Sequence, residues 1–440
     1  MNFIKYFGTD GIRGKVGKFP ITPDFFFKLG FVIGCLFFKE HKKKVIVGID
    51  TRKSSFILEL ALNSGLSASG VSVISTGSIP TPAIGYLTGF FNLELGIVIS
   101  ASHNLFQDNG IKFFLKNGIK LSSRIEKKIE NALNKPISFQ NVLYSASVIR
   151  IFHAQRQYII FCKSVFPKYF NLRNFKIVLD CANGSTYKIA PEIFKDFGAN
   201  LIIISASPDG YNINKNCGSV YINNLKNLVL SEKADVGLAL DGDGDRMIMV
   251  DHLGNKVDGD KILYILAKFC LHRESKQEGV VTTIMSNRGL LIELKKLGIP
   301  FFVSNVGDVN IIKKLREKNW RFGAESSGHV AMLDKSFCCD GIITSLKIME
   351  VMMDYNMSLF QLCSGVKFFP QKIINIDFEK RDYFFKYRAM QFLISKYKGM
   401  LSKFGRIYFR RSGTEECFRI IVEDENEKIV NYISDKIKNI

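Results

Sequence analysis

The sequence predicts an α/β protein made of several units with mixed, mostly parallel sheets, followed by a smaller C-terminal α+β unit. The main observation is a recurring pattern in which a β-branched run ends in Asp and a polar loop, at residues 45–50, 175–180 and 236–241. After the first two runs, a helix-like segment leads to another short apolar run, at residues 71–75 and 200–205. This strand–helix–strand spacing favours right-handed crossovers between parallel strands.

A comparable unit surrounds residue 300, and the chain after residue 368 has a different pattern. There we expect strands at 372–378, 406–410 and 418–423, and helices at 383–402 and 427–440. The last helix carries its apolar residues on one stripe, as a helix packed on a core does. These changes of pattern divide the chain into four predicted domains, at residues 1–150, 151–254, 255–368 and 369–440.

Length and composition agree with a multidomain globular protein. A chain of 440 residues predicts two to four domains, and its 47% hydrophobic and 23% charged residues are ordinary for a soluble protein. No apolar run reaches the ~20 residues of a membrane span. The first residues lack the apolar core and cleavage site of a signal peptide. Nine scattered cysteines without a CxxC pair predict free thiols in a reducing compartment, so we expect a cytoplasmic protein.

The net charge of +20 raises the question of nucleic-acid binding. The basic excess is split between residues 1–150 and 261–440, whereas residues 151–260 are balanced. Because no basic tail or single basic helix concentrates the charge, we expect no nucleic-acid partner. A general cationic surface still attracts anionic small molecules.

The most informative loop, residues 100–104, follows an apolar run and contains Ser102 and His103. A β-branched run that ends abruptly in small polar residues predicts a buried strand with a loop at its C-terminal end. In open α/β sheets, ligands and chemistry lie at that end. Ser102 is therefore our candidate to carry phosphate. A helix N-cap is the alternative, since Ser and Asn cap helices well.

Carboxylates follow a later predicted strand, where Asp241, Asp243 and Asp245 alternate with glycine. Three ionised carboxylates so close repel one another unless they share a cation, and the glycines let their oxygens converge. Oxygen ligands suit Mg²⁺. An EF-hand loop is excluded because Arg246 and His252 stand where it needs Gly and Glu. A solvated acidic turn is the alternative. With the serine loop, these residues suggest a phosphoserine that shares Mg²⁺ with the three aspartates.

A third polar segment lies between two predicted strands near the C-terminus. It offers guanidinium groups, hydroxyls and a flexible backbone, through Arg410, Ser412, Gly413 and Thr414. Such a set forms an anion site, which Arg419 on the following strand could join from the side. A basic hairpin turn is the alternative.

A fourth polar segment, residues 323–329, places Glu325 and Ser327 two positions apart between glycines. That spacing could present two acceptors to a sugar diol. His329 could donate or accept a proton, and a structural histidine is the alternative.

Two further segments each present one cation on a glycine-flanked turn. Arg13 lies in residues 8–14, and Lys112 follows Ser102 by ten positions, which would let it return to the same site. Either segment alone would predict only a turn.

These segments, in this order, resemble the α-D-phosphohexomutase superfamily, and the resemblance runs from residue 3 to about 423. The stretches that carry it are residues 6–14, 96–104, 241–246, 323–329 and 410–415. Supporting stretches are residues 80–82, 180–184, 257–260 and 306–308. The conjunction of separate loops is far more specific than any one of them.

The resemblance implies three similar α/β domains and a smaller fourth domain around a central cleft. It implies interconversion of glucosamine 6-phosphate and glucosamine 1-phosphate through a phosphoserine enzyme and a bisphosphorylated sugar, on the route to UDP-N-acetylglucosamine and cell wall. The implied cofactors are one Mg²⁺ per chain and glucose or glucosamine 1,6-bisphosphate as activator. The implied partner is a small phosphosugar, with no nucleic acid or membrane, and the protein is a monomer or homodimer. A phosphomannomutase or phosphoglucomutase with the same chemistry is the alternative.

The resemblance also implies roles for single residues. The phosphoserine is Ser102, and the Mg²⁺ ligands are Ser102, Asp241, Asp243 and Asp245. The residues near the transferred group are Arg13, Lys112 and His329, and either Lys112 or His329 is the general base. The sugar-hydroxyl contacts are Glu325 and Ser327. The loop for the non-reacting phosphate comprises Arg410, Ser412, Gly413 and Thr414.

Four positions depart from the superfamily's usual pattern. Glu416 stands where Pro follows the phosphate loop, Val309 stands where Arg is common, Ser326 replaces Asn or Gln, and Ser55 replaces Gly. These departures bear on efficiency and sugar preference rather than on the catalytic core.

Overall fold

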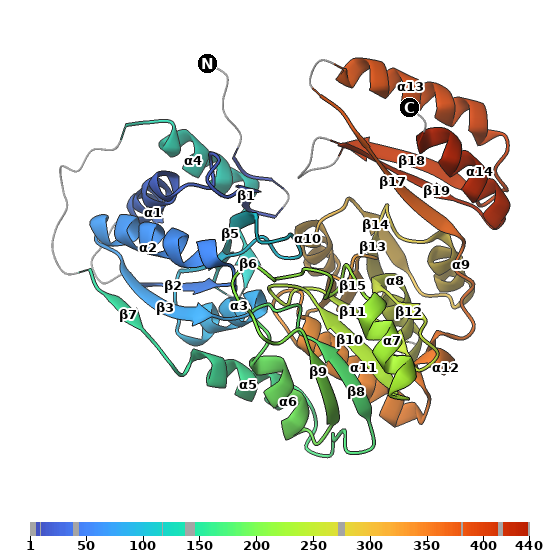
Figure 1. Cartoon of the computed structure of the whole chain (residues 1–440), viewed down its shortest axis with the longest axis horizontal. Helices are drawn as coiled ribbons and strands as arrows, with labels where there is room; N and C mark the ends of the chain where they lie inside the picture. Colours follow the sequence, from blue (N-terminus) through green and yellow to red (C-terminus); the bar gives the residue numbers. More distant parts are fainter. Residues whose placement is uncertain are drawn as a thin grey trace.

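The computed structural model describes residues 6–8, 10–37, 44–116, 118–136, 146–271, 278–379, 382–411 and 417–438. Three mixed sheets, each packed with helices, are followed by a smaller antiparallel sheet (Figure 1). We call the parts built around these four sheets domains I to IV. Domain IV stands at one end of the molecule and carries the described C-terminus (Figure 1).

Domain I is built on a seven-stranded sheet of order β1-β5-β4-β2-β3-β7, with β6 paired to β5. Its elements are β1 (Ile12–Lys15), α1 (Pro23–Phe37), β2 (Lys44–Ile49), α2 (Lys53–Ala68), β3 (Ser72–Ser78), α3 (Thr81–Phe90), β4 (Leu95–Ile99), β5 (Asp108–Leu115), β6 (Ile119–Lys120), α4 (Ser123–Leu133) and β7 (Val148–Arg150). Strands β4, β2, β3 and β7 pair in parallel. The apolar runs β2 and β4 are almost wholly buried, as expected for parallel strands covered on both faces.

Domain II is a five-stranded sheet of order β12-β11-β10-β8-β9, in which β10, β8 and β9 are parallel. Its elements are α5 (Ala154–Ser164), β8 (Lys176–Asp180), α6 (Ile189–Asp196), β9 (Asn200–Ile204), α7 (Asn223–Ser231), β10 (Val236–Leu240), β11 (Met247–Asp251) and β12 (Lys256–Val257). Strand β10 is the second fully buried run that ends at a polar loop.

Domain III has a four-stranded sheet of order β14-β13-β15-β16, parallel except for the last pair. Its elements are α8 (Gly259–Leu266), a π-helical turn η1 (Ala267–Leu271), β13 (Val280–Thr283), α9 (Arg288–Lys296), β14 (Phe301–Ser304), α10 (Asp308–Lys318), β15 (Phe322–Ala324), β16 (Val330–Met332), α11 (Gly341–Tyr355) and α12 (Leu359–Cys363).

Domain IV is a three-stranded antiparallel sheet of order β17-β19-β18 that packs on two helices. Its elements are β17 (Gln371–Asp377), α13 (Tyr383–Lys398), β18 (Arg406–Arg411), β19 (Cys417–Glu423) and α14 (Glu427–Lys438).

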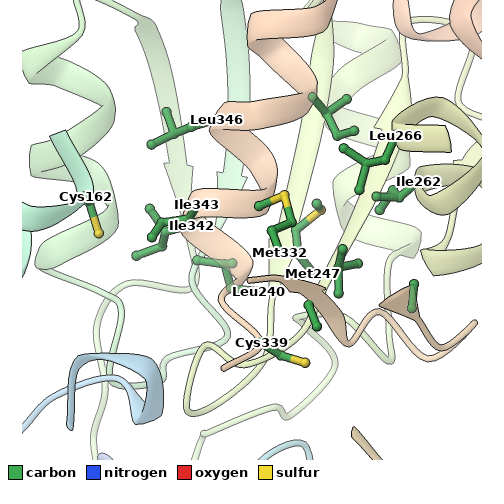
Figure 2. Packing of buried hydrophobic residues seen from close by; sticks show 14 of the residues in the cluster. Cys162, Leu240, Met247, Ile262, Leu266, Met332, Cys339, Ile342, Ile343 and Leu346 are labelled. Carbon is green, nitrogen blue, oxygen red and sulfur yellow. The ribbon is translucent and has the colours of Figure 1, made fainter. Parts of the chain in front are cut away.

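One apolar core runs through domains I, II and III. Figure 2 shows part of it, where Ile342 and Ile343 of α11 lie beside Leu240 and Met247 of domain II and near Met332 of domain III. Domain IV has its own separate core. The first three domains are therefore packed as one body, whereas domain IV is attached through a smaller contact.

Several charged and polar groups connect domains III and IV. The Arg406 guanidinium lies 2.7 Å from Glu423 and donates to the carbonyl oxygens of Ile284 and Ser286, at 2.8 and 2.6 Å. Glu423, which is fully buried, also accepts the backbone N–H of Arg288 at 2.6 Å. Because Arg406 and Glu423 of domain IV both bind residues 284–288 of domain III, this loop fixes how domain IV is oriented.

The predicted α/β class and the C-terminal α+β part are confirmed, with mixed sheets in which parallel strands alternate with antiparallel flanks. The helix expected at 383–402 ends at Lys398, and the strands expected around residues 372–378 and 406–410 begin or end within a residue of prediction. All nine cysteines are free thiols. Among the described residues, no helix combines the length and apolar character that crossing a membrane requires.

Candidate active site

Ser102 lies in a buried loop at the C-terminal end of β4 and is 0% exposed. The next described element is strand β5, so the helix N-cap alternative is wrong. Its hydroxyl donates to Asp241 Oδ2 at 2.5 Å and lies 3.4 Å from Asp245 Oδ1. The fold therefore brings the serine loop of domain I against the aspartate loop of domain II.

The serine loop adopts a strained backbone that its neighbours hold in place. Ser102 has φ of +52°, a left-handed conformation that is uncommon for a residue with a side chain. Arg52 and Asn214 each donate to the carbonyl oxygens of Ser102 and Asn104, at 2.8–2.9 Å. Arg52 is itself fixed by Asp50 at 2.8 Å. Groups from domains I and II thus fix the position of the hydroxyl.

The aspartate loop approaches the serine loop closely because it contains glycine. A Cβ atom on Gly242 would lie 2.7 Å from the Ser102 carbonyl oxygen. Gly244 has φ of +74°, which turns the chain between Asp243 and Asp245. All three aspartates are buried, and one oxygen from each lies within 4.8 Å of the others.

The electrostatics of this cluster reflect shared negative charge. Burial, together with the nearby charges of Asp245 and Asp243, raises the pKa of Asp241 to about 7. Burial also disfavours the charged form of Asp245, but Lys112 and His329 outweigh it and hold that pKa well below its usual value. The pKa values of Asp241 and Asp245 shift in opposite directions because Lys112 and His329 contact Asp245.

Lys112 supplies the main positive charge within the cluster. Its ammonium lies 2.8 Å from Asp243, 2.6 Å from Asp245 and 3.3 Å from Asp10. Burial alone would lower the pKa of Lys112, but the three carboxylates outweigh it and keep that pKa well above its ordinary value.

Arg13 reaches the same place from β1. Its guanidinium pairs with Asp10 and donates to the Ala101 carbonyl oxygen at 3.4 Å, next to Ser102. The Nε atom of Arg13 is buried and has no hydrogen-bond partner among the described residues. A donor of this kind suits an anion held beside Ser102.

Glu325, Ser327 and His329 lie together on the turn between β15 and β16. Glu325 accepts from the Gly307 N–H at 2.7 Å and from the Ser327 hydroxyl at 3.2 Å, and it lies 2.9 Å from His329 Nδ1. Burial opposes ionisation of Glu325, but the bond to His329, the charge of His329 and the Gly307 N–H lower its pKa to about 2. This turn therefore presents an ionised carboxylate.

His329 links that turn to the aspartate cluster. Its Nε2 lies 3.1 Å from Asp245 Oδ1 and also 3.1 Å from Arg246 Nε. One nitrogen cannot donate to the first and accept from the second at once, and the two flanking carboxylates favour the donor. Burial and Arg246 lower the pKa of His329, but Asp245 and Glu325 outweigh them and raise it to about 9.

In domain IV, Arg410 and Arg419 stand directly opposite each other on neighbouring strands. Like charges in this arrangement repel unless an anion lies between them. Burial and the charge of Arg419 lower the pKa of Arg410. The predicted phosphate-loop residues Ser412, Gly413 and Thr414 lie outside the described residues.

Residues of all four domains line a cleft of about 430 Å³. The predicted site residues that line it are Arg13, Glu325, Ser327, His329, Arg410 and Arg419. Ser102, Lys112 and the three aspartates are buried beside the cleft, where Asp245 lies 3.1 Å from the cleft residue His329. A larger hollow of about 780 Å³, lined by Lys233, His252 and Met353, contains none of the predicted site residues.

The buried donors around Ser102 fit a divalent cation. They are carboxylate oxygens and one hydroxyl, which are the ligands that Mg²⁺ takes in proteins. Asp243 Oδ1 is buried and has no hydrogen-bond partner within the described residues. Buried carboxylate oxygens are nearly always hydrogen-bonded or bound to a cation, and a cation here would bind this oxygen.

Sequence reasoning did not single out several residues that shape the site. Arg52 follows the strand-terminal Asp50 by two positions, and Asp10 lies inside the noted segment of residues 8–14, three positions before Arg13. Asn214 lies in a segment without a motif, and it contacts the Ser102 loop, which is 112 residues away in the sequence.

Comparison with known proteins agrees with the geometry. Three models of phosphoglucomutase/phosphomannomutase α/β/α domains match: domain I at residues 4–139, domain II at 156–254 and domain III at 258–368. The chain belongs to the phosphoglucomutase/phosphomannomutase family. A relative named phosphoglucosamine mutase, from Buchnera aphidicola subsp. Baizongia pistaciae, is 55% identical over 99% of this chain and 96% of its own. Another of the same name, from Erwinia tasmaniensis, is 49% identical over 98% of both chains.

Solved structures of the family share the fold. A phosphoglucomutase/phosphomannomutase family protein from Burkholderia thailandensis superposes with a TM-score of 0.79 at 22% identity, covering 99% of this chain and 96% of that one. An N-acetylphosphoglucosamine mutase from Aspergillus fumigatus, solved with GlcNAc-6P and magnesium, has a TM-score of 0.69 at 17% identity, covering 100% and 95%.

Proposed function

We propose that this member of the family is a phosphoglucosamine mutase, which interconverts glucosamine 6-phosphate and glucosamine 1-phosphate. The observation that carries the chemistry is the Ser102 hydroxyl, 2.5 Å from Asp241 within a buried cluster of carboxylates and cations. The sugar assignment is supported by relatives of that name at 48–55% identity over nearly the whole chain. The product belongs to the synthesis of UDP-N-acetylglucosamine and cell wall.

In this proposal, Ser102 carries a phosphoryl group and donates it to the free hydroxyl of the phosphosugar. The P–O bond to serine breaks as the bond to sugar oxygen forms, and the product is a sugar bisphosphate. The bisphosphate then turns over in the cleft and returns its other phosphoryl group to Ser102. Negative charge that spreads over the transferred group is stabilised by Arg13 and Lys112, whose positions are fixed before substrate arrives.

Mg²⁺ would be held by Ser102, Asp241, Asp243 and Asp245, where it would supply further compensation of phosphoryl charge. Glucose or glucosamine 1,6-bisphosphate would serve as the activator that phosphorylates the serine. Glu325 and Ser327 would accept and donate hydrogen bonds at the sugar hydroxyls.

The remote phosphate of the sugar would bind in domain IV. Arg410 and Arg419 line the cleft there, and Ser412, Gly413 and Thr414 follow Arg410 closely in the sequence. This phosphate site could accept either end of the sugar if domain IV moves. Domain IV has a separate core and is attached to domain III through hydrogen bonds such as that from Arg406 to Ile284, which suits such motion.

The general base is either Lys112 or His329. Both hold their protons in the present arrangement, since carboxylates surround each of them. His329 is the better suited of the two, because its pKa, raised to about 9, is nearer the working range than the pKa of Lys112, and a cation on Asp245 would lower it.

Intact mass spectrometry before and after incubation with glucose 1,6-bisphosphate tests the phosphoserine. We expect a gain of one phosphoryl group that maps to Ser102. Ser102→Ala should gain none and should lose mutase turnover, while Ser64→Ala, at an exposed serine on α2, should behave as the parent protein. Full turnover in Ser102→Ala would reject the role of the serine.

The sugar is tested separately by kcat/KM for the 6-phosphates of glucosamine, glucose and mannose. Glucosamine 6-phosphate should give the highest value. A higher value for mannose or glucose would replace the proposal with a phosphomannomutase or phosphoglucomutase.

A further inference from the structure

Lys120 joins domain I to domain III beside the cleft. It ends β6, whose backbone pairs with β5 of domain I. Its ammonium forms ion pairs with Asp10 of domain I and, at 2.7 Å, with Asp308 of domain III. The side chain is only 11% exposed, so little water competes for these contacts.

The two carboxylates that Lys120 contacts belong to different parts of the candidate site: Asp10 contacts the cations beside Ser102, and Asp308 lies next to the residue that binds Glu325. Asp10 also pairs with Arg13 and lies 3.3 Å from Lys112, the two cations next to Ser102. Asp308 begins α10, and the residue before it, Gly307, donates its N–H to Glu325 at 2.7 Å. Lys120 therefore stands between the phosphoryl-transfer cations and the sugar-recognition carboxylate.

The same two parts of the site are also connected by a second path of contacts. Glu325 lies 2.9 Å from His329, and His329 lies 3.1 Å from Asp245. Asp245 lies 2.6 Å from Lys112, which returns to Asp10. These contacts, with Lys120, form a closed ring of polar groups through domains I, II and III. Opening a ring at one member loosens the positions of the others.

Lys120 itself is not among the residues that line the cleft, whereas Asp10 and Asp308 are. Burial disfavours its charge, but Asp10 and Asp308 outweigh burial and raise its pKa above the ordinary value. It therefore stays protonated and keeps both ion pairs.

We propose that Lys120 is a positioning residue, which holds Asp308 against Asp10 and so fixes the distance between Glu325 and the cations beside Ser102. The inference rests on the proposed mutase function for its effect on turnover.

Lys120→Met tests the role, because Met keeps most of the length and removes the charge. We expect kcat/KM for glucosamine 6-phosphate to fall roughly tenfold to hundredfold, mainly through kcat, as misplacement of reacting groups does. Phosphorylation of Ser102 by glucose 1,6-bisphosphate should remain measurable by mass. Lys120→Arg should recover most of the turnover. Lys163→Met, which breaks an exposed pair with Asp196, is the matched control and should match the parent protein.

Asp308→Asn and the double variant add a second measure. Because both residues act through one contact, the double variant should lose scarcely more than Lys120→Met alone. Losses that multiply would show independent roles and would overturn the inference, as would turnover of Lys120→Met within twofold of the parent.

Hydrogen exchange of the Gly307 amide gives a readout without substrate. In Lys120→Met this amide should exchange faster than in the parent and the Lys163→Met control, because its bond to Glu325 is less well held. Unchanged protection would overturn the inference. If the parent protein turns over no hexose phosphate, the proposed function fails; if the parent turns over and Lys120→Met does so equally well, only the present inference fails.

Discussion

Lys112→Met should destabilise the protein by about 3–5 kcal/mol when no divalent cation is present, because removing one partner of a buried ion pair leaves uncompensated charge. The ammonium lies 2.8 Å from Asp243 and 2.6 Å from Asp245, and its side chain is 1% exposed. Met is of similar length and fills the same space, so the variant removes the charge with little change in packing.

The expected shift in melting temperature follows from the size of the unfolding unit. With an unfolding entropy of about 2 cal/mol/K per residue, such a loss lowers the midpoint by about 3–10 °C, depending on how much of the chain unfolds together. Mg²⁺ should restore much of this loss, since a ligand at a hundred times its Kd stabilises by about 2.7 kcal/mol. A cation among the carboxylates replaces the missing ammonium.

The assay is thermal unfolding of parent and variant with Mg²⁺ or with NaCl at equal ionic strength. Lys176→Met is the matched control, because its 3.0 Å pair with Glu232 lies at the surface, with side chains 33% and 44% exposed, which makes it worth at most about 1 kcal/mol. The Mg²⁺-dependent rise should be larger in Lys112→Met than in the parent or the control. Equal melting without divalent cations, or equal Mg²⁺ responses, would refute the reasoning.

Three further changes test other parts of the structure. Arg406→Met should raise KM for the phosphosugar roughly tenfold, since charged hydrogen bonds of about 1.5–3 kcal/mol orient domain IV; an unchanged KM in steady-state kinetics would contradict this. Gly184→Ala should abolish the Mg²⁺-dependent rise in melting temperature, because its Cβ would lie 2.4 Å from the Gly242 oxygen and displace the aspartate loop; a preserved rise would disprove the displacement. Burial, followed by the charge of Asp258, raises the pKa of Asp260 from 3.8 to about 8. The folded state therefore keeps a proton that the unfolded state releases, and the stability of the parent falls as pH rises from about 4 to 8. Asp260→Asn cannot ionise, so its melting temperature should rise relative to that of the parent across this pH range; a difference that stays constant with pH would argue against this.

The fold was predictable where local pattern and packing agree. Residues 45–50 and 236–241 carry β-branched runs that end at polar loops, and these become β2 and β10 with the loops at their C-terminal ends. The α-helical ends were less predictable, since the helix from Tyr383 stops at Lys398 rather than at residue 402. Helix ends depend on local capping and on what the last turn packs against.

The candidate site was predictable where one loop contains its own chemistry. Ser102 and the aspartates of residues 241–245 were singled out because small polar or acidic residues interrupt apolar runs. Lys120 and Asn214 were not singled out, because each contacts a segment more than 100 residues away and neither lies in a distinctive motif. Contacts of this kind depend on how whole domains dock, which no local pattern records.

The apolar core shared by the first three domains has a consequence during translation. Ile84 and Phe114 are made early, yet the same core includes Cys338, whose sulfur lies 3.2 Å from where a Cβ on Gly85 would be. At about 5–20 residues per second, the ribosome needs on the order of 10–50 s to make the intervening chain. For that time the apolar side chains of the nascent N-terminal part that later pack against domain III stay uncovered, and surface of this kind favours aggregation.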